Sequence, residues 1–321
     1  MSFNNNLIIG NTDSFSITVA SQLFEPNGDV RHSSPYNAFL DICTSEGFIG
    51  SELEFLKRPN TNTEEGVNYL LGKFAEALIV MKCNDIPEYN HFFAHEARLA
   101  QRTNNPFIDR FVAIGTGLQQ TRIHPLYNFH CQMNDQQRDI VWVNKRDVKS
   151  LLTVPNRSGY IAGLQIKVSS DWRYAYKKIK DYLMPMVYFD LNNDWHQLDA
   201  TITREKALSW DSGLTDWQHV HLVPQNDIVH KIKSNLLLFR QLLIKLVHNE
   251  ISVQYIIDMA KYEGNANLGH AITSGFTPNS QIIVSKTALL NCEQILQEEL
   301  QNNWMNIGFP IQNNVNQVRA W

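Results

Sequence analysis

The spacing of apolar residues predicts a buried helix over residues 66–82, "GVNYLLGKFAEALIVMK". Apolar side chains recur there at three- and four-residue intervals, which places them on one face of a helix. They are Val67, Leu70, Leu71, Phe74, Leu78 and Met81. Glu76 lies opposite this stripe on a helical wheel, but Ile79 and Val80 share its side. The pattern therefore predicts a helix that is covered on both faces.

Short runs rich in β-branched residues predict strands in the middle of the chain. "RDIVWVN", residues 138–144, is apolar on both faces, as expected for a buried strand. "GYIAGLQIKVSS", residues 159–170, and "MPMVYFDL", residues 184–191, predict two more. Between them, "DWRYAYKKIKDYL", residues 171–183, predicts a helix with a basic outer face. Helix, strand, strand, helix and strand in this order predict a mixed α/β core.

These patterns divide the chain into three predicted parts. Residues 1–62 mix strand-like pieces with turn signals and are expected to form an N-terminal extension. Residues 63–205 hold the α/β core, with an insertion at about 83–136, where no hydrophobic period persists. Residues 206–321 are expected to form a mainly helical C-terminal region.

Two long helical patterns support that C-terminal assignment. Residues 227–251 form a strongly apolar pattern, and residues 285–304 form another. The apolar face of residues 227–251 fits either the protein core or a contact with a second copy or a partner protein, and core is the commoner use of such a face.

Composition places the chain among ordinary globular proteins. It has 321 residues, of which 43% are hydrophobic and 19% charged. The N-terminal residues do not read as a secretion signal, and the longest apolar runs are too short to cross a bilayer. The four cysteines, at positions 43, 83, 131 and 292, have neither metal-type nor disulfide-type spacing. We therefore expect a cytoplasmic protein that is not bound to a membrane.

Positive charge is concentrated in one part of the sequence. The net charge of -4 argues against a protein that coats nucleic acid. Residues 138–180, however, contain ten basic and three acidic residues, and they enclose the strand predicted at 159–170. This surplus fits a nucleic-acid surface or, more simply, a solvated face.

The predicted strand at 159–170 carries two polar residues on one face. Because side chains alternate along a strand, Gln165 and Lys167 share the face opposite Leu164 and Ile166. With Asp139 and Glu76 they would form a set of hard oxygen ligands of the kind that Mg²⁺ prefers, beside an ammonium group that can stabilise charge on a phosphate. The combination predicts a site that cleaves phosphodiester bonds.

These residues carry a resemblance to a known superfamily. Glu76 in "GKFAEALIV", Asp139 in "RDIVWV" and Gln165-Ile166-Lys167 in "AGLQIKVS" resemble the PD-(D/E)xK nucleases, in the Mrr-like branch where Gln replaces an acidic residue. The same stretch is similar to bacterial defence-associated domains. The resemblance covers roughly residues 64–192 and implies a restriction-endonuclease-like mixed sheet flanked by helices, followed by the additional helical C-terminal region.

The resemblance also implies a role for each residue. Asp139 would be the central metal ligand, Gln165 a second and weaker one, and the Ile166 carbonyl a further donor. Glu76 would reach the metal or position its water. Lys167 would orient or help deprotonate the attacking water and stabilise the phosphate. The chain would then be an endonuclease that depends on Mg²⁺ or Mn²⁺ and hydrolyses DNA, duplex DNA first, in a restriction or anti-phage defence system, with a second copy or a defence-system protein as partner.

Two other functions remain open. The chain could be a binding or assembly subunit that keeps the nuclease fold without its chemistry, or an RNA-directed nuclease in which bases stack on Trp172, Tyr174 or Tyr176. Taken alone, Gln165 and Lys167 fit an exposed edge strand, Asp139 a cap at a strand end, and Glu76 a solvated helix face.

Other motifs give weaker signals. The spacing of His91 and His95 could hold zinc, and His219 and His221 would share a strand face, but no third ligand is placed and structural roles are favoured. "GTGLQQTR", residues 115–122, lacks the lysine of a phosphate-binding loop. The long gap from Asp139 to Gln165 requires residues 144–158 to form an extended hairpin or loop.

Overall fold

The computed structural model forms two compact units. One comprises residues 41–253, and the other comprises residues 1–40 and 254–321. The structure describes residues 34–50, 52–56, 64–99, 104–131, 138–155, 157, 159–213 and 216–260. In the second unit the described residues are mainly helical, at 35–40 and 254–260. All residues of the predicted site lie in the larger unit, which is considered below.

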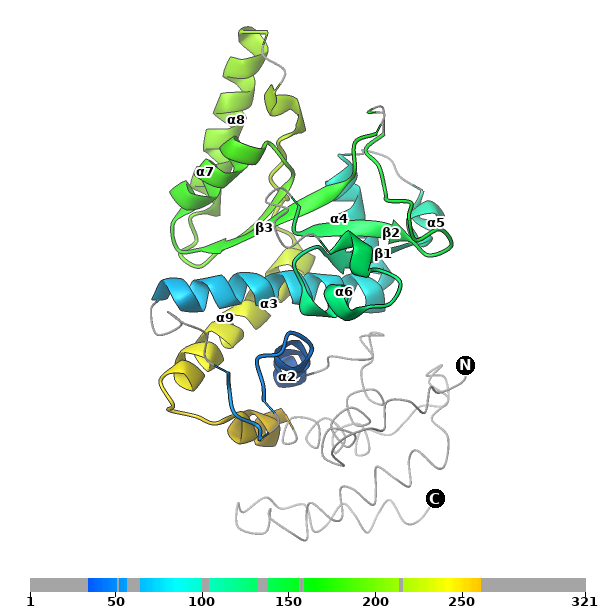
Figure 1. Cartoon of the computed structure of the whole chain (residues 1–321). Helices are drawn as coiled ribbons and strands as arrows, with labels where there is room; N and C mark the ends of the chain where they lie inside the picture. The colour runs from blue at the N-terminus through cyan, green and yellow to red at the C-terminus, as the bar shows by residue number, and fades with distance from the viewer. Residues whose placement is uncertain are drawn as a thin grey trace, which may run out of the picture. The chain divides into compact units, whose positions relative to one another are not determined.

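The larger unit is built from four strands and a set of helices (Figure 1). The strands are β1 (Phe111–Gly115), β2 (Ile140–Asn144), β3 (Gly163–Ser169) and β4 (Met186–Asp190). The α-helices are α2 (Pro35–Ser45), which begins in the other unit, α3 (Glu64–Asp85), α4 (Pro87–Arg98), α5 (Asn105–Ile108), α6 (Gln119–Ile123), α7 (Trp172–Tyr182), α8 (Trp195–Asp211) and α9 (Asp227–Val247). Two short 3₁₀ turns are η2 (Asn128–His130) and η3 (Asp216–His219).

The strands form one mixed sheet in the order β1-β2-β3-β4. β1 pairs with β2 and β2 with β3 in the antiparallel sense, whereas β3 and β4 are parallel and are connected through α7. Parallel neighbours need a crossover connection, and a helix is the usual one. The prediction of a mixed α/β core, with helices flanking the sheet, is confirmed.

The two faces of β3 are covered by different helices. Trp142 of β2 donates its ring N–H to Asn90 of α4, 2.8 Å away, so this face of β2 meets α4. Leu164 pairs with Ile140, which shares the face of Trp142. Side chains alternate along β3, so Gln165 and Lys167 belong to the opposite face.

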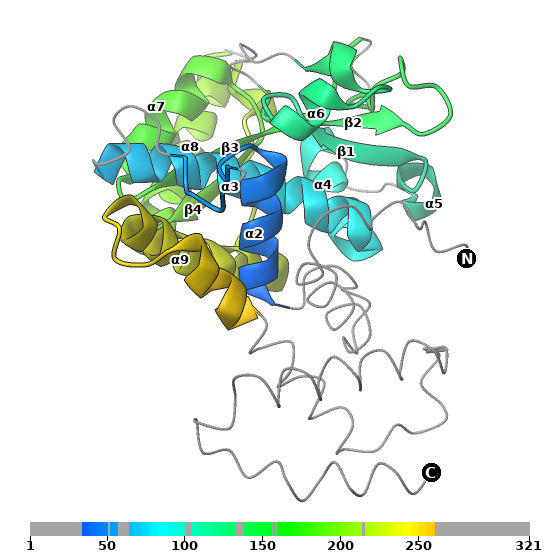
Figure 2. The same cartoon turned by 60° about the horizontal axis from the view of Figure 1, so that its bottom comes forward.

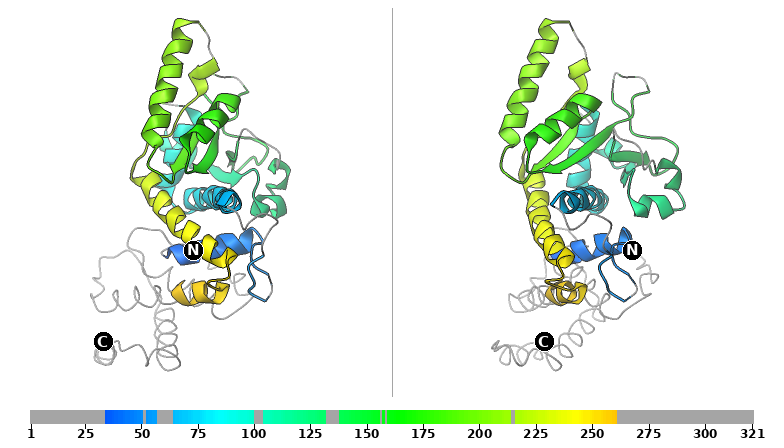
Figure 3. Two further views of the ribbon diagram at one scale, coloured as in Figure 1. Left: turned by 90° about the vertical axis from the view of Figure 1, so that its left-hand side faces the viewer. Right: turned by 60° about the vertical axis from the view of Figure 1, so that its left-hand side comes forward.

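That opposite face continues onto β4. Gln165 pairs with Met186 and Lys167 with Tyr188. Met186 and Tyr188 are packed in an apolar cluster with Ala175 of α7, and Figure 3 shows α7 running beside the sheet on this side. The predicted strand alternation is therefore confirmed.

The middle of helix α3, residues 74–80, is buried on all sides, as its sequence predicts, whereas Tyr69 nearer its start is 60% exposed. Phe74 is fully buried, and the centroid of its ring lies 5.8 Å from that of Phe239 in α9, in an edge-to-face arrangement. On the other side of α3, Ile79 and Glu76 are buried too. The apolar face of α9 is thus part of the core, where it packs across α3 (Figures 1 and 3). Burying a Phe or Leu side chain stabilises the fold by about 1.5–3 kcal/mol.

The segment 83–136 differs from the prediction of an insertion, because it supplies β1 at one edge of the sheet and α4 on one face. Figure 2 shows β1 beside β2, with α6 next to them. The five residues of β1, "FVAIG", are too few to show a period, and a short apolar run does not distinguish a strand from a helix.

Other boundaries also differ from those predicted. Helix α8 runs through the expected boundary at residue 205, and residues 41–50 belong to the larger unit rather than to an N-terminal extension. The connection between β2 and β3 is a loop with isolated bridges from Val143 to Leu151 and from Thr153 to Ile161, as the long spacing requires. The helix predicted at 285–304 lies outside the described residues. Within the described part of the chain, no helix combines the length and the apolar character needed to cross a membrane.

Candidate active site

The predicted site lies where β2 and β3 separate. Their ladder has only two register pairs, Ile140 with Leu164 and Val141 with Gly163. Just before β2, the Asp139 N–H still donates to the Leu164 carbonyl at 2.9 Å, and the Asp139 carbonyl accepts from the Thr116 N–H at 2.9 Å. The main chain at Asp139 is therefore held from both sides, while the strands diverge beyond it.

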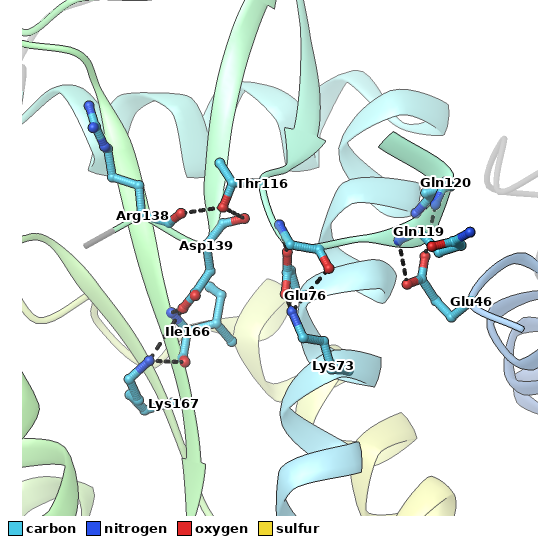
Figure 4. Close-up of polar contacts among 11 residues, drawn as sticks. Glu46, Lys73, Glu76, Thr116, Gln119, Gln120, Arg138, Asp139, Ile166 and Lys167 are labelled. Carbon is cyan, nitrogen blue, oxygen red and sulfur yellow. Dashed lines mark hydrogen bonds and ion pairs between the residues drawn. The ribbon is translucent and has the colours of Figure 1, made fainter. Parts of the chain in front are cut away.

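The side chain of Asp139 binds the main chain of β3 beyond the last register pair of the β2-β3 ladder. Its Oδ2 accepts a hydrogen bond from the Ile166 N–H at 2.6 Å and lies 3.3 Å from Lys167 Nζ (Figure 4). Lys167 Nζ also donates to the Ile166 carbonyl at 2.9 Å. The other carboxylate oxygen, Oδ1, accepts no hydrogen bond from any described residue. Asp139 thus satisfies the edge of β3 with one of its two carboxylate oxygens, and its side chain is 25% exposed.

Glu76 approaches the same region from α3. Its Oε2 accepts from Lys73 Nζ at 2.9 Å, and its Oε1 accepts from the Gly117 N–H at 3.3 Å. Lys73 Nζ also donates to the Gly117 carbonyl at 3.3 Å. Only 3% of Glu76 is exposed, and a carboxylate so deeply buried requires partners of this kind.

The loop after β1 connects Glu76 with Asp139. It is the "GTG" of residues 115–117: Gly117 binds Glu76, and the neighbouring Thr116 binds the main chain of Asp139. A Cβ atom at Gly115 would lie 2.7 Å from Glu76 Oε1 and 2.4 Å from Leu118, so glycine is needed for this close approach to α3.

A second buried carboxylate anchors the loop. Glu46 accepts hydrogen bonds from the N–H groups of Gln119 and Gln120, at 2.8 and 3.3 Å (Figure 4). These bonds hold the first turn of α6, and with it the "GTG" loop, in place.

Electrostatics couple the two acidic residues of the site. Burial raises the pKa of Glu76 to about 7; Lys73 opposes this shift, and the negative charge of Asp139 adds to it. Burial acts to lower the pKa of Lys73, but Glu76 and Asp139 outweigh it, so the pKa of Lys73 is raised. Two carboxylates that repel each other in this way form a region of negative potential, which favours a cation.

The structure brings the predicted residues together to different degrees. Asp139, Ile166 and Lys167 are in direct contact, and Glu76 joins them through the "GTG" loop and through its electrostatic coupling to Asp139. Gln165 shares the face of Lys167 on β3 and is fully enclosed. Exposed-surface interpretations of Glu76 and Gln165 are therefore wrong, because both side chains are buried.

The donor atoms suit a hard divalent cation. Mg²⁺ binds through one or two carboxylates and keeps several waters. The residues that could hold such an ion are Asp139 and Glu76, through their carboxylates, with Gln165 and the Ile166 carbonyl as neutral oxygen donors. Among the described residues, no group of three or more His, Cys, Asp or Glu side chains is placed so that it could hold a metal ion.

No protein-family model, curated protein or solved structure matches this chain. The chemistry of the site is therefore inferred from its geometry.

The histidine pairs make structural contacts. His91 binds Asp109 at 2.6 Å, and His95 binds Asn105 at 3.2 Å. His221 binds Glu96 of α4. His219 ends the 3₁₀ turn η3 instead of lying in a strand.

Two parts of the site are not predicted from the sequence. Lys73 lies three residues before Glu76, and this spacing places two side chains together on a helix, so the pair was recognisable. The sequence singles out Gly115 and Gly117 only as part of a glycine-containing loop, whereas in the structure they allow the end of β1 to approach Glu76.

The pKa of Glu76 predicts a pH dependence of stability. The folded chain keeps its proton up to about pH 7, whereas the unfolded chain loses it near the ordinary value of 4.5. The unfolded state therefore binds fewer protons in this interval, and the free energy of unfolding should fall by roughly 2–3 kcal/mol as the pH rises through it. Urea denaturation in metal-free buffer at about pH 5 and about pH 8 measures this change.

Glu76→Gln should remove most of that fall. Glu88→Gln, at an exposed position of α4, should leave it unchanged. An equal fall in the wild type and in Glu76→Gln would assign it to other groups.

Proposed function

We propose that this protein is a metal-dependent endonuclease that hydrolyses phosphodiester bonds in DNA, in a restriction or anti-phage defence system. The observation that carries the proposal is the contact of Asp139 with Lys167 and with the Ile166 N–H at the point where β2 and β3 separate. An acid and an ammonium 3.3 Å apart can serve one metal ion and one phosphate.

The fold supports the proposal. A buried helix that carries Glu76 precedes an antiparallel β1-β2-β3 sheet, and α7 then connects β3 to the parallel strand β4. This arrangement is compatible with a restriction-endonuclease-like core. The basic residues between 138 and 180 surround the proposed site in sequence and favour a polyanionic substrate.

We assign roles from the contacts of each residue. Asp139, with Oδ1 available, and Glu76 would hold Mg²⁺ or Mn²⁺, with Gln165 and the Ile166 carbonyl as neutral donors. When bound, the ion would polarise the phosphate and lower the pKa of a water molecule. Lys167 orients the attacking water and neutralises charge that develops on the phosphate. Lys73 keeps Glu76 in position.

The test is cleavage of nucleic acid by purified full-length protein. Supercoiled plasmid, linear duplex and single-stranded DNA are incubated with Mg²⁺, with Mn²⁺ or with a chelator. We expect cutting that needs the metal, and we expect Lys167→Ala to lower the rate by about 10²-fold, because it removes the cation that stabilises the transition state.

Lys245→Ala provides the matched control. Lys245 is exposed in the last turn of α9, a helix that contributes no residue to the proposed site, so its removal should not change the rate. Metal-independent cutting, or equal rates for Lys167→Ala and the wild type, would reject this site. If the wild type binds DNA but cuts none of the three substrates, the chain is instead a binding or assembly subunit.

A further inference from the structure

Helix α7 presents an unusual combination of aromatic and basic residues. Among its eleven residues are Trp172, three tyrosines and four basic residues, against a single acid, Asp181. Each aromatic ring has a cation near its face: Arg173 with Trp172, Lys180 with Tyr176, and Lys178 with Tyr174 and Tyr182. Cations and rings attract each other at such distances, so these side chains hold one another in place.

Two of these rings are used for packing. Trp172 and Tyr176 lie against the apolar cluster between α7, α8 and β4. Tyr176 also stacks on Trp217, with ring centroids 6.5 Å apart and planes at 20°. The expectation that Trp172 and Tyr176 stack on bases is therefore not supported by their positions, and Tyr174 is the remaining candidate.

The other two tyrosines form a ladder along the outer side of α7. Lys178 lies 6.0 Å from the ring of Tyr174 and 5.6 Å from the ring of Tyr182, one helical turn before and after it. Tyr174 is 47% exposed. Apolar and aromatic residues at this spacing normally face the core, but Ala175 and Ile179 fill that position here. Within this ladder Tyr174 is exposed, while Lys178 and Tyr182 are half-buried.

The positive charge around the ladder indicates which class of ligand it would bind. Arg173, Lys177 and Lys180 are exposed on the same helix. Arg173 is 3.6 Å from Asp171, and an exposed pair of this kind contributes little to stability. Rings that can stack on bases, combined with cations that can pair with phosphates, are the features of surfaces that bind single-stranded nucleic acid. In a duplex the faces of the bases are already stacked on one another, so they are not accessible to an exposed tyrosine ring.

We propose that the ladder of Tyr174, Lys178 and Tyr182 binds an unpaired stretch of DNA and directs it to the site on β3. The choice of DNA rests on the proposed function. Helix α7 begins three residues after β3 ends and contacts it, so DNA bound along α7 would lie on the element that directly follows the strand carrying Lys167 (Figure 1). The substrate class then becomes DNA with a single-stranded segment, which differs from the intact duplex expected from the sequence.

Binding without cleavage tests this proposal separately from catalysis. Fluorescence anisotropy with the full chain in chelator, and a fluorescein-labelled oligothymidine of about twenty nucleotides as probe, measures the dissociation constant. We expect Tyr174→Ala to raise it about tenfold, as the loss of one stacked base would. Tyr174→Phe, which keeps the ring, should bind like the wild type. Lys178→Ala should reduce the slope of log affinity against log salt by about one.

Two controls distinguish base stacking from non-specific binding. Tyr255, which is 46% exposed in another helix, is the matched position, and Tyr255→Ala should bind like the wild type. The duplex of the same length should bind about tenfold more weakly than the single strand.

Three outcomes would overturn the proposal. They are wild-type affinity for Tyr174→Ala, equal or tighter binding of the duplex, and tighter binding of the matching RNA oligomer, which would assign the ladder to RNA. Because the assay contains no metal, loss of binding here leaves the cleavage test unaffected, and absence of cleavage leaves this test unaffected.

Discussion

Replacing Asp139 by asparagine is expected to lower metal-dependent DNA cleavage on the order of 10³-fold, the largest effect on activity that we anticipate. Asparagine keeps an oxygen that can accept from the Ile166 N–H, so β3 stays in place. The negative charge that would bind the cation is lost, and Lys167 loses its ion pair. Initial rates on plasmid at saturating Mg²⁺, with circular dichroism to verify folding, measure the effect.

Asp147→Asn is the matched control for this variant. Asp147 is an exposed acid in the loop between β2 and β3, a few residues beyond Asp139 in sequence. Its replacement should leave the rate within about twofold of the wild type. If Asp139→Asn cuts as fast as Asp147→Asn, Asp139 holds no catalytic metal.

The largest effect on stability is expected from Lys233→Met in α9. Lys233 forms an ion pair with Asp190 at the end of β4 and also donates to Asn193 at 3.0 Å. The Asp190 side chain is only 5% exposed, so removal of the lysine leaves a buried charge without its counter-ion. This should cost about 3–5 kcal/mol in the free energy of unfolding, measured by urea denaturation at neutral pH.

A double variant distinguishes the loss of the counter-ion from the loss of packing. Asp190→Asn combined with Lys233→Met removes both charges, and the asparagine oxygen can still accept from the Trp195 N–H at the start of α8. This variant should recover most of the lost stability. Lys231→Met, at an exposed position of α9, should change it by no more than about 0.5 kcal/mol. A double variant as unstable as Lys233→Met alone would show that the lysine acts through packing instead.

The parts of the fold that follow from local patterns were predictable. Helix α3 could be read from its apolar stripe, and Ile79 and Val80 indicated that Glu76 would be covered as well. Alternation in "GLQIKVS" placed Gln165 and Lys167 on one face of β3. Such features depend only on the periods of helices and strands, which the sequence records directly.

The parts that depend on tertiary contacts were not predictable. The position of β1 at the sheet edge depends on pairing with β2, and its five residues carry no period of their own. The contact of Asp139 with the Ile166 N–H depends on where the β2-β3 ladder ends, which no local pattern specifies. Burial of Glu76 was indicated by the sequence, but its contact with the "GTG" loop was not.

The packing of α9 across α3 also determines when the site can form during synthesis. The packing around Phe74 is complete only after Phe239 has been synthesised, because the two rings are in contact in the core. At translation speeds of about 5–20 residues per second, the intervening chain takes on the order of ten to thirty seconds to be made. Until α9 leaves the ribosome, the helix that carries Glu76 lacks one side of its packing. We therefore expect the nascent chain to lack an assembled site for most of its synthesis, and a protein truncated before α9 to lack one as well.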